Sequence, residues 1–140
     1  MELNALEQLL GENHVAVVTT FRRDGRPQMS LVTVGSFEGG LAFTTQQGRA
    51  KAANLKRDPR CAIMLTKPNW RGYGVLDGDA EVRGSHNTDA EMLRIDLRAV
   101  YRVAAGQEHP DWEAYDRAMV EQRRVVVVLK HGRLVTVNAG

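Results

Sequence analysis

The chain has 140 residues, of which 43% are hydrophobic and 26% charged, and its formal net charge is +2. This ordinary globular composition excludes a disordered chain, and the length predicts one domain over residues 1–140. No apolar run approaches the roughly 20 residues that span a bilayer, no signal peptide is recognisable, and the single cysteine excludes an internal disulfide, so we expect a cytoplasmic protein without a membrane partner.

The first part of the chain predicts a helix followed by a hairpin. Leucines at 3, 6, 9 and 10 form one helical stripe, and Gly11 is a natural end for that helix. Residues 14–22 and 27–34 are typical of two strands, joined by Asp24-Gly25, a pair that favours a tight turn with positive φ. A further strand is expected over residues 41–45, after the turn at 38–40.

The middle of the chain predicts a short helix and two strands. The helix covers residues 48–57 and ends at Asp58-Pro59, because proline disfavours helical geometry in the residue before it. The strands cover residues 60–67 and 70–83. Gly74 and Gly78 in the second of these strands indicate bends or a bulge, as the corner of a barrel requires.

The last part predicts two helices and two closing strands. Thr88 to Glu91 matches a capping box, an apolar stripe follows as far as Ala104, and Gly106 closes this helix. Asp111 begins the second helix. Residues 125–129 form a strand, and His131-Gly132 turns into another over 134–137. This order of elements indicates an α+β fold whose sheet closes into a barrel.

The stretch after the strand at 41–45 has the pattern of an anion site. The strand ends in Thr44 and Thr45, and Gly48 then opens a helix whose first turn carries Arg49 and Lys51. Free N–H groups and the helix dipole already favour an anion there, so two cations make better sense if a phosphate or carboxylate occupies the site. A solvated helix start gives the same pattern, and spacing alone leaves both interpretations open.

Charge distribution adds to this hypothesis. Residues 49 to 60 hold five basic side chains against one acid, Asp58, in a chain of nearly balanced charge. Such a local patch indicates a discrete anionic ligand rather than a long polyanion, and we expect no nucleic-acid partner.

Other candidates are ambiguous on pattern alone. Gln28 and Ser30 alternate with Met29 and Leu31, as in a ligand cleft, although a solvent-facing sheet side produces the same alternation. Trp70 and Tyr73 suit stacking on a planar ring, but aromatic strand residues more often belong to a core.

The sequence shows no recognisable motif for a metal site or for a catalytic nucleophile. The histidines at 14, 86, 109 and 131 are scattered, and Cys61 lies in an apolar run where it packs as a small hydrophobe. With no metal and no catalytic motif expected, difficult chemistry would come from a bound organic cofactor.

Four segments in chain order carry a resemblance to a known family: A-V-V-T-T-F with D-G-R-P-Q over 16–28, G-R-A-K-A-A-N-L with R-D-P-R over 48–60, Y-G-V-L-D-G over 73–78, and H-P-D-W with Y-D-R-A-M and R-R-V over 109–125. They resemble the pyridoxamine 5'-phosphate oxidase-like (PPOX class) FMN-binding split-barrel superfamily, and within it the actinobacterial group B of F420-dependent flavin/deazaflavin oxidoreductases. The resemblance implies an antiparallel split β-barrel with flanking helices. Residues 130–140 do not follow the usual tail, so no substrate contacts carry over from it.

The resemblance also implies a homodimer with cofactor at the subunit interface. Residues matching Arg49 and Lys51 would hold the cofactor phosphate or an oligoglutamate tail, with help from Asn54. The remaining positions it implies are the strand residues Gln28, Ser30 and Thr44 toward the ring or ribityl chain, Arg26 toward the tail, and Ala50, Trp70 and Tyr73.

The function so implied is an F420-dependent oxidoreductase, which transfers a hydride between the deazaflavin C5 and a small electrophilic substrate. Two alternatives stay open: an FMN-binding oxidoreductase on the same scaffold, and a carrier or sensor that binds F420 without turnover. Because no acid, base or nucleophile is recognisable, the sequence does not separate the first function from the last.

Overall fold

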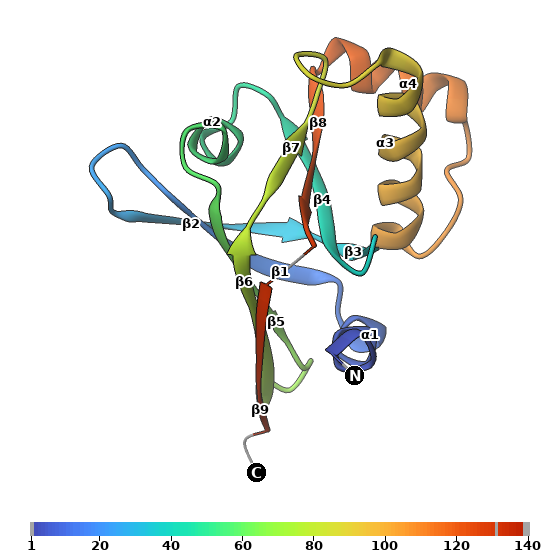
Figure 1. Cartoon of the computed structure of the whole chain (residues 1–140). Helices are drawn as coiled ribbons and strands as arrows, with labels where there is room; N and C mark the ends of the chain where they lie inside the picture. Colours follow the sequence, from blue (N-terminus) through green and yellow to red (C-terminus); the bar gives the residue numbers. More distant parts are fainter. Residues whose placement is uncertain (1, 131, 139–140) are drawn as a thin grey trace.

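The computed structural model describes residues 2–130 and 132–138, so His131 of the expected turn lies outside the described residues. Two antiparallel sheets form a split barrel (Figure 1). The larger has the order β2 (Pro27–Thr33), β1 (Val15–Phe21), β5 (Arg60–Thr66), β6 (Gly72–Asp79) and β9 (Gly132–Asn138). The smaller has the order β3 (Gly35–Phe37), β4 (Gly40–Gln46), β8 (Arg124–Leu129) and β7 (Glu81–Arg83). The expected α+β split barrel is confirmed.

The barrel interior takes alternate residues of each strand, since successive side chains point to opposite faces. In β1, Ala16, Val18 and Thr20 are buried, whereas Val17 and Thr19 between them are half-buried. Ile63 of β5 and Phe43 of β4 meet them in one core between the sheets. The barrel is therefore filled by aliphatic side chains from both sheets.

The strand expected over residues 70–83 is in fact two strands. β6 belongs to the larger sheet and β7 to the smaller, and the chain changes sheet at Ala80, whose N–H donates to the Pro59 carbonyl (2.8 Å). Gly74 and Gly78 keep regular pairing with β5 and do not mark the bend. Gly74 has a different role, since a Cβ there would lie 2.6 Å from Leu9 Cδ1.

Four helices flank the sheets. α1 (Glu2–Glu12) buries Leu6, Leu9 and Leu10, and it runs one residue beyond the expected end at Gly11. α2 (Ala50–Arg57) begins two residues later than expected, with Arg49 at its N-cap. Figure 1 shows α3 and α4 lying together against the smaller sheet, while α2 lies apart from them. None of these helices is long and apolar enough to cross a membrane within the described chain.

The caps of α3 (Ala90–Ala105) and α4 (Trp112–Glu121) come from aspartates. Asp89, and not Thr88, caps α3 by accepting from the N–H groups of Glu91 and Met92. Asp111 caps α4 through the Ala114 N–H, as the sequence predicts for that helix start. Gly106 ends α3 with a φ of +72°, a left-handed conformation that glycine adopts without strain.

A second core joins these helices to the outward side of β4 and β8. Ala42, Val126 and Val128 pack there against helix residues that include Leu97 and Tyr115. The Tyr115 hydroxyl donates to the Leu97 carbonyl (2.9 Å), which ties α4 to α3. Burial raises the pKa of Tyr115 to about 12, so this phenol stays protonated as a donor.

An ion-pair network centred on Arg83 ties distant elements together. Its guanidinium contacts Glu38 (2.7 Å), Glu81 (2.9 Å) and Asp96 (3.2 Å), and Lys130 contacts Glu38 (3.1 Å). These residues come from the β3–β4 turn, β7, α3 and the end of β8. The hydrogen bond from Arg83 is the main reason that the pKa of Glu38 falls to about 2.

One face of the larger sheet carries exposed apolar side chains. Met29 and Leu31 of β2 are 64% and 72% exposed, and the β1–β2 register places them beside Thr19 and Val17 on the same face. The face, here called the outer face, also includes Val15, Tyr73, Val135 and Val137. A patch of this kind on a sheet is typical of an interaction surface.

Candidate functional site

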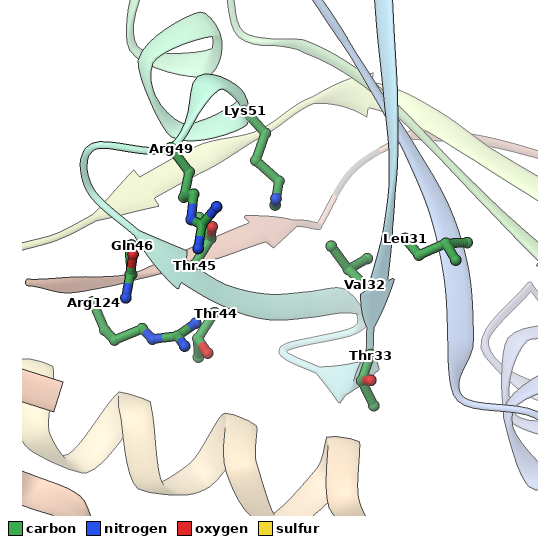
Figure 2. A pocket seen from close by; sticks show the side chains of 9 residues that line it. All are labelled: Leu31, Val32, Thr33, Thr44, Thr45, Gln46, Arg49, Lys51 and Arg124. Atoms are coloured by element: carbon green, nitrogen blue, oxygen red, sulfur yellow. The ribbon is translucent and has the colours of Figure 1, made fainter. Parts of the chain in front are cut away.

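A cavity of about 230 Å³ opens where the N-terminus of α2 lies over β4 (Figure 2). Figure 2 shows Arg49 and Lys51 pointing from α2 toward β4, while Arg124 extends toward Thr44. We call this the cation cavity. Its lining consists of Leu31, Val32 and Thr33 from β2, Thr44, Thr45 and Gln46 from β4, and Arg49, Lys51 and Arg124.

Local backbone geometry brings these residues together. Gln46 pairs with Arg124 at the last rung of the β4–β8 ladder. The chain then turns back, with the Arg49 N–H bonded to the Gln46 carbonyl (3.0 Å) and the Gln47 N–H to the Arg123 carbonyl (2.8 Å). This turn brings the first residues of α2 close to Thr44 and Thr45, near the end of β4.

The charges of the cation cavity lack acidic partners. Among the described residues, no acid forms a salt bridge with Arg49, Lys51 or Arg124. Arg124 donates instead to the neutral Gln122 Oε1 (2.9 Å). Partial burial, followed by repulsion from Arg49 and Arg124, lowers the pKa of Lys51. The cavity therefore holds positive charge that the described chain does not neutralise.

This arrangement fits a phosphate or a carboxylate. Guanidinium groups bind such oxygens in a planar fork, ammonium binds them as a point charge, and the hydroxyls of Thr44 and Thr45 add further donors. The N–H groups at the start of α2 also favour an anion. The phosphate of a flavin or deazaflavin cofactor has the chemistry that this donor set suits.

Three of the residues implied by the resemblance line this cavity, namely Thr44, Arg49 and Lys51. Ala50 is exposed at the first position of α2, with no side chain beyond Cβ to offer. Arg26 is exposed at the tip of the β1–β2 hairpin, where its N–H bonds Asp24 Oδ1 (3.0 Å). The roles of all five residues toward a cofactor stay predictions.

Asn54 and Gln28 contact each other at the base of α2. The buried Asn54 donates from Nδ2 to Thr20 Oγ1 (3.1 Å) and to Gln28 Oε1 (3.0 Å), and its Oδ1 accepts from Arg57 (3.1 Å). Gln28 and Ser30 are half-buried on the face of β2 opposite to Met29 and Leu31. The polar side of this strand therefore faces inward, and the apolar side is the exposed one.

Trp70 and Tyr73 lie outside the lining of the cation cavity. Tyr73 borders a separate hollow with Lys67 and Thr136, and Trp70 is 77% exposed in the turn before β6. Within one copy of the chain, these two aromatic residues are not assembled with Arg49 and Lys51.

Arg124, Thr33 and Gln46 also line the cavity, although the sequence patterns did not single them out. Arg124 lies near residue 49 only because β4 pairs with β8, a contact across about eighty positions of chain. Its place in the R-R-V segment is a signal that could have found it. Gln46 ends β4 directly after Thr45, which the sequence patterns had singled out, whereas Thr33 ends β2 with no such neighbour.

Metal and thiol chemistry find no centre in the described residues. No group of three or more histidine, cysteine or acidic side chains is placed to hold a metal ion. Cys61 is buried in the barrel, and burial raises the pKa of its thiol to about 12, so it does not form a reactive thiolate at neutral pH.

Solved structures share this fold at low sequence identity. A conserved hypothetical protein, Rv2991 from Mycobacterium tuberculosis, aligns with a TM-score of 0.77 at 20% identity, over 99% of this chain and 85% of its own. A protein named F420 reductase aligns at 0.63 and 21% identity, over 92% and 94%. A pyridoxamine 5'-phosphate oxidase-related, FMN-binding protein from Nostoc punctiforme aligns at 0.70 and 17%, over 96% and 83%.

Sequence comparison with family models adds a match along nearly the whole chain. The model of pyridoxamine 5'-phosphate oxidase matches residues 3–136, which include every strand of both sheets up to the last residues of β9 and every residue of the cation cavity. This chain belongs to the pyridoxamine 5'-phosphate oxidase family.

Proposed function

We propose that the protein is an F420-dependent oxidoreductase of the group B type, acting on a small electrophilic substrate. The observation that carries this proposal is the uncompensated charge of Arg49, Lys51 and Arg124 around one cavity. An F420 cofactor offers a phosphate and a carboxylate-bearing tail, and both suit such a site. The F420 reductase among the structural neighbours supports the choice of cofactor.

The chain's own part in the reaction is binding and orientation. Arg49 and Lys51 would hold the phosphate, and Thr44 would fix the chain that leads to the ring. The bound deazaflavin supplies the chemistry, which is transfer of a hydride between its C5 and an electrophilic carbon. No residue that lines the cation cavity is an acid, histidine, cysteine or tyrosine, so we assign no proton donor to that cavity.

A homodimer through the outer face is part of the same proposal. Leu31 belongs to that face and also lines the cation cavity, so the cavity adjoins the exposed apolar surface. A second copy on this surface would cover its apolar side chains and close the cavity. Trp70, in the turn before β6, and Tyr73, on β6, would then reach the cofactor of the other copy, which would account for their separation from Arg49 here.

An FMN-dependent oxidoreductase is the second candidate. The FMN-binding neighbour favours it, and FMN carries the same phosphate on a shorter ligand. A third candidate is an F420 carrier or sensor without turnover, which the lack of acid–base residues in the cation cavity favours.

Parallel titrations with F420 and FMN, followed by tryptophan fluorescence, test the cofactor. We expect tighter binding of F420, weakened about a hundredfold by Lys51→Glu because the substitution reverses a charge at the phosphate. Lys56→Glu is the matched control, since Lys56 lies on the same helix, is exposed and does not line the cavity. Tighter FMN binding selects the second candidate, and equal affinities for Lys51→Glu and the control contradict the site.

Turnover is tested by stopped-flow oxidation of bound F420H2 with a panel of enones, imines and quinones. Loss of F420H2 absorbance that depends on substrate concentration supports an oxidoreductase. Tight F420 binding without oxidation by any compound identifies the carrier or sensor.

A further inference from the structure

A second cavity, of about 490 Å³, lies between the helices and the smaller sheet. We call it the helix cavity. It shares Thr33, Thr44 and Arg124 with the cation cavity, so the two hollows adjoin at that wall. Its other walls come from α3 and α4. Its size falls within the roughly 300–1,000 Å³ of small-molecule sites.

The walls that belong to the helix cavity alone are apolar or aromatic. They are Val100, Tyr101, Ala104 and Ala105 of α3, with Tyr115 and Met119 of α4. The Tyr115 hydroxyl is bonded to the Leu97 carbonyl, so this side chain offers the cavity its ring rather than a free polar group. Ala104 and Ala105 occupy little space, which leaves room for a flat ligand against the aromatic side chains.

Charge in the helix cavity is confined to one end. No acidic side chain lines it, and Arg124 is its single charged lining residue among those described. Arg124 sits at the wall shared with the cation cavity, beside the hydroxyls of Thr33 and Thr44. A ligand there meets apolar surface over most of its length and one cation with two hydroxyls at one end.

We propose that the helix cavity binds the substrate and selects a planar, largely apolar ring that carries no more than one anionic group, directed at Arg124. This inference rests on the proposed function, because it places the substrate next to the cofactor that the cation cavity holds. A phosphorylated or dianionic substrate is disfavoured. A second negative charge would be buried among Tyr101, Tyr115 and Met119 without a partner, and that is costly.

The test uses 2-naphthoate as the probe, with naphthalene-2,6-dicarboxylate as its dianionic counterpart. Binding is measured by the shift of the Met119 methyl resonance and by titration, with and without cofactor. We expect 2-naphthoate to bind, the dicarboxylate to bind at least about tenfold more weakly, and Arg124→Gln to weaken 2-naphthoate.

Filling the cavity separates this inference from non-specific binding. Ala104→Leu should weaken 2-naphthoate by about tenfold or more, because the added atoms occupy the ring site. Ala105→Leu, at an exposed position on the rim, should act in the same direction and serves if Ala104→Leu does not fold. Ala90→Leu is the control, since it makes the same change at an exposed position of the same helix.

The outcomes distinguish the two proposals. Unchanged affinity for 2-naphthoate in both filled variants overturns the inference, as does equal binding of the dicarboxylate, whether or not F420 binds. Loss of 2-naphthoate in the filled variants, with F420 affinity retained, supports it. If neither F420 nor FMN binds but 2-naphthoate responds as expected, the proposed function fails while the ring site stands.

Discussion

Two clusters of charge in this molecule differ in whether the chain neutralises them. Around Arg83, three carboxylates surround one guanidinium, and Lys130 completes the network. Around the cation cavity, Arg49, Lys51 and Arg124 face hydroxyls and an amide instead of acids. The first cluster joins the β3–β4 turn, β7, α3 and β8, whereas the second lines an opening.

This difference separates a charge cluster that the fold itself neutralises from one that it leaves without acidic partners. A compensated network lowers the energy of the folded chain itself, provided its hydrogen bonds are satisfied. An uncompensated cluster costs stability until an anion binds, and anion binding is the role that we propose for the cation cavity. Substitutions in the two clusters should therefore have opposite signatures.

The largest expected effect is on stability, from Arg83→Met. Removing the guanidinium leaves Glu38, Glu81 and Asp96 without their shared partner, and we expect a loss of roughly 3 kcal/mol in the free energy of unfolding. Urea denaturation measures it. Arg22→Met is the control, because the exposed Arg22–Asp24 pair should contribute less than about 1 kcal/mol. Equal losses of unfolding free energy in the two variants would contradict a structural role for Arg83.

The second expected effect is on affinity, from Lys51→Gln. Losing one of three cations should weaken phosphate-bearing cofactors by about tenfold and make binding less sensitive to salt. Titrations at low and high ionic strength measure both changes. An unaltered salt dependence would mean that Lys51 does not face the anion.

The third expected effect is on the pH dependence of stability. The pKa of Glu38 is lowered from 4.5 to about 2, so its contribution to stability is complete above pH 4.5 and is lost as the pH falls toward 2. The difference between the native chain and Arg83→Met should shrink over that interval. A difference that is constant from pH 7 to pH 2 would contradict the assignment.

The smallest expected effect is a slight rise in the Tm of the ligand-free protein for Lys51→Gln. Because the pKa of Lys51 is lowered in the fold, its charge opposes folding at neutral pH, and removing the charge relieves that cost. Differential scanning fluorimetry without cofactor measures it. With saturating cofactor, we expect the native chain to have the higher Tm, because it binds the cofactor more tightly. A lower Tm for Lys51→Gln both with and without cofactor would contradict a destabilising charge at Lys51.

Local patterns predicted most elements because their causes are local. Asp24-Gly25 predicted its turn, and Gly25 has a φ of +82°. Contacts distant in sequence escaped prediction. The change of sheet at Ala80 depends on two partner strands, and the position of Arg124 depends on the pairing of β4 with β8.

The candidate site shows the same division. Thr44, Arg49 and Lys51 lie within one short segment, and their spacing was sufficient to identify them as candidates for an anion site. The environment of Gln28 was not readable in this way, because alternation along β2 gives two faces but does not say which of them is buried. Only the packing of Asn54 against that strand decides it.

The continuous segment formed by β6 and β7 has a consequence for how the molecule opens. Since this segment crosses from one sheet to the other at Ala80, neither sheet can separate as an independent unit without breaking the ladder of its neighbour. Amide protons in the centre of β5 and of β8 should therefore exchange with solvent through the same global event, at the same free energy, although they belong to different sheets.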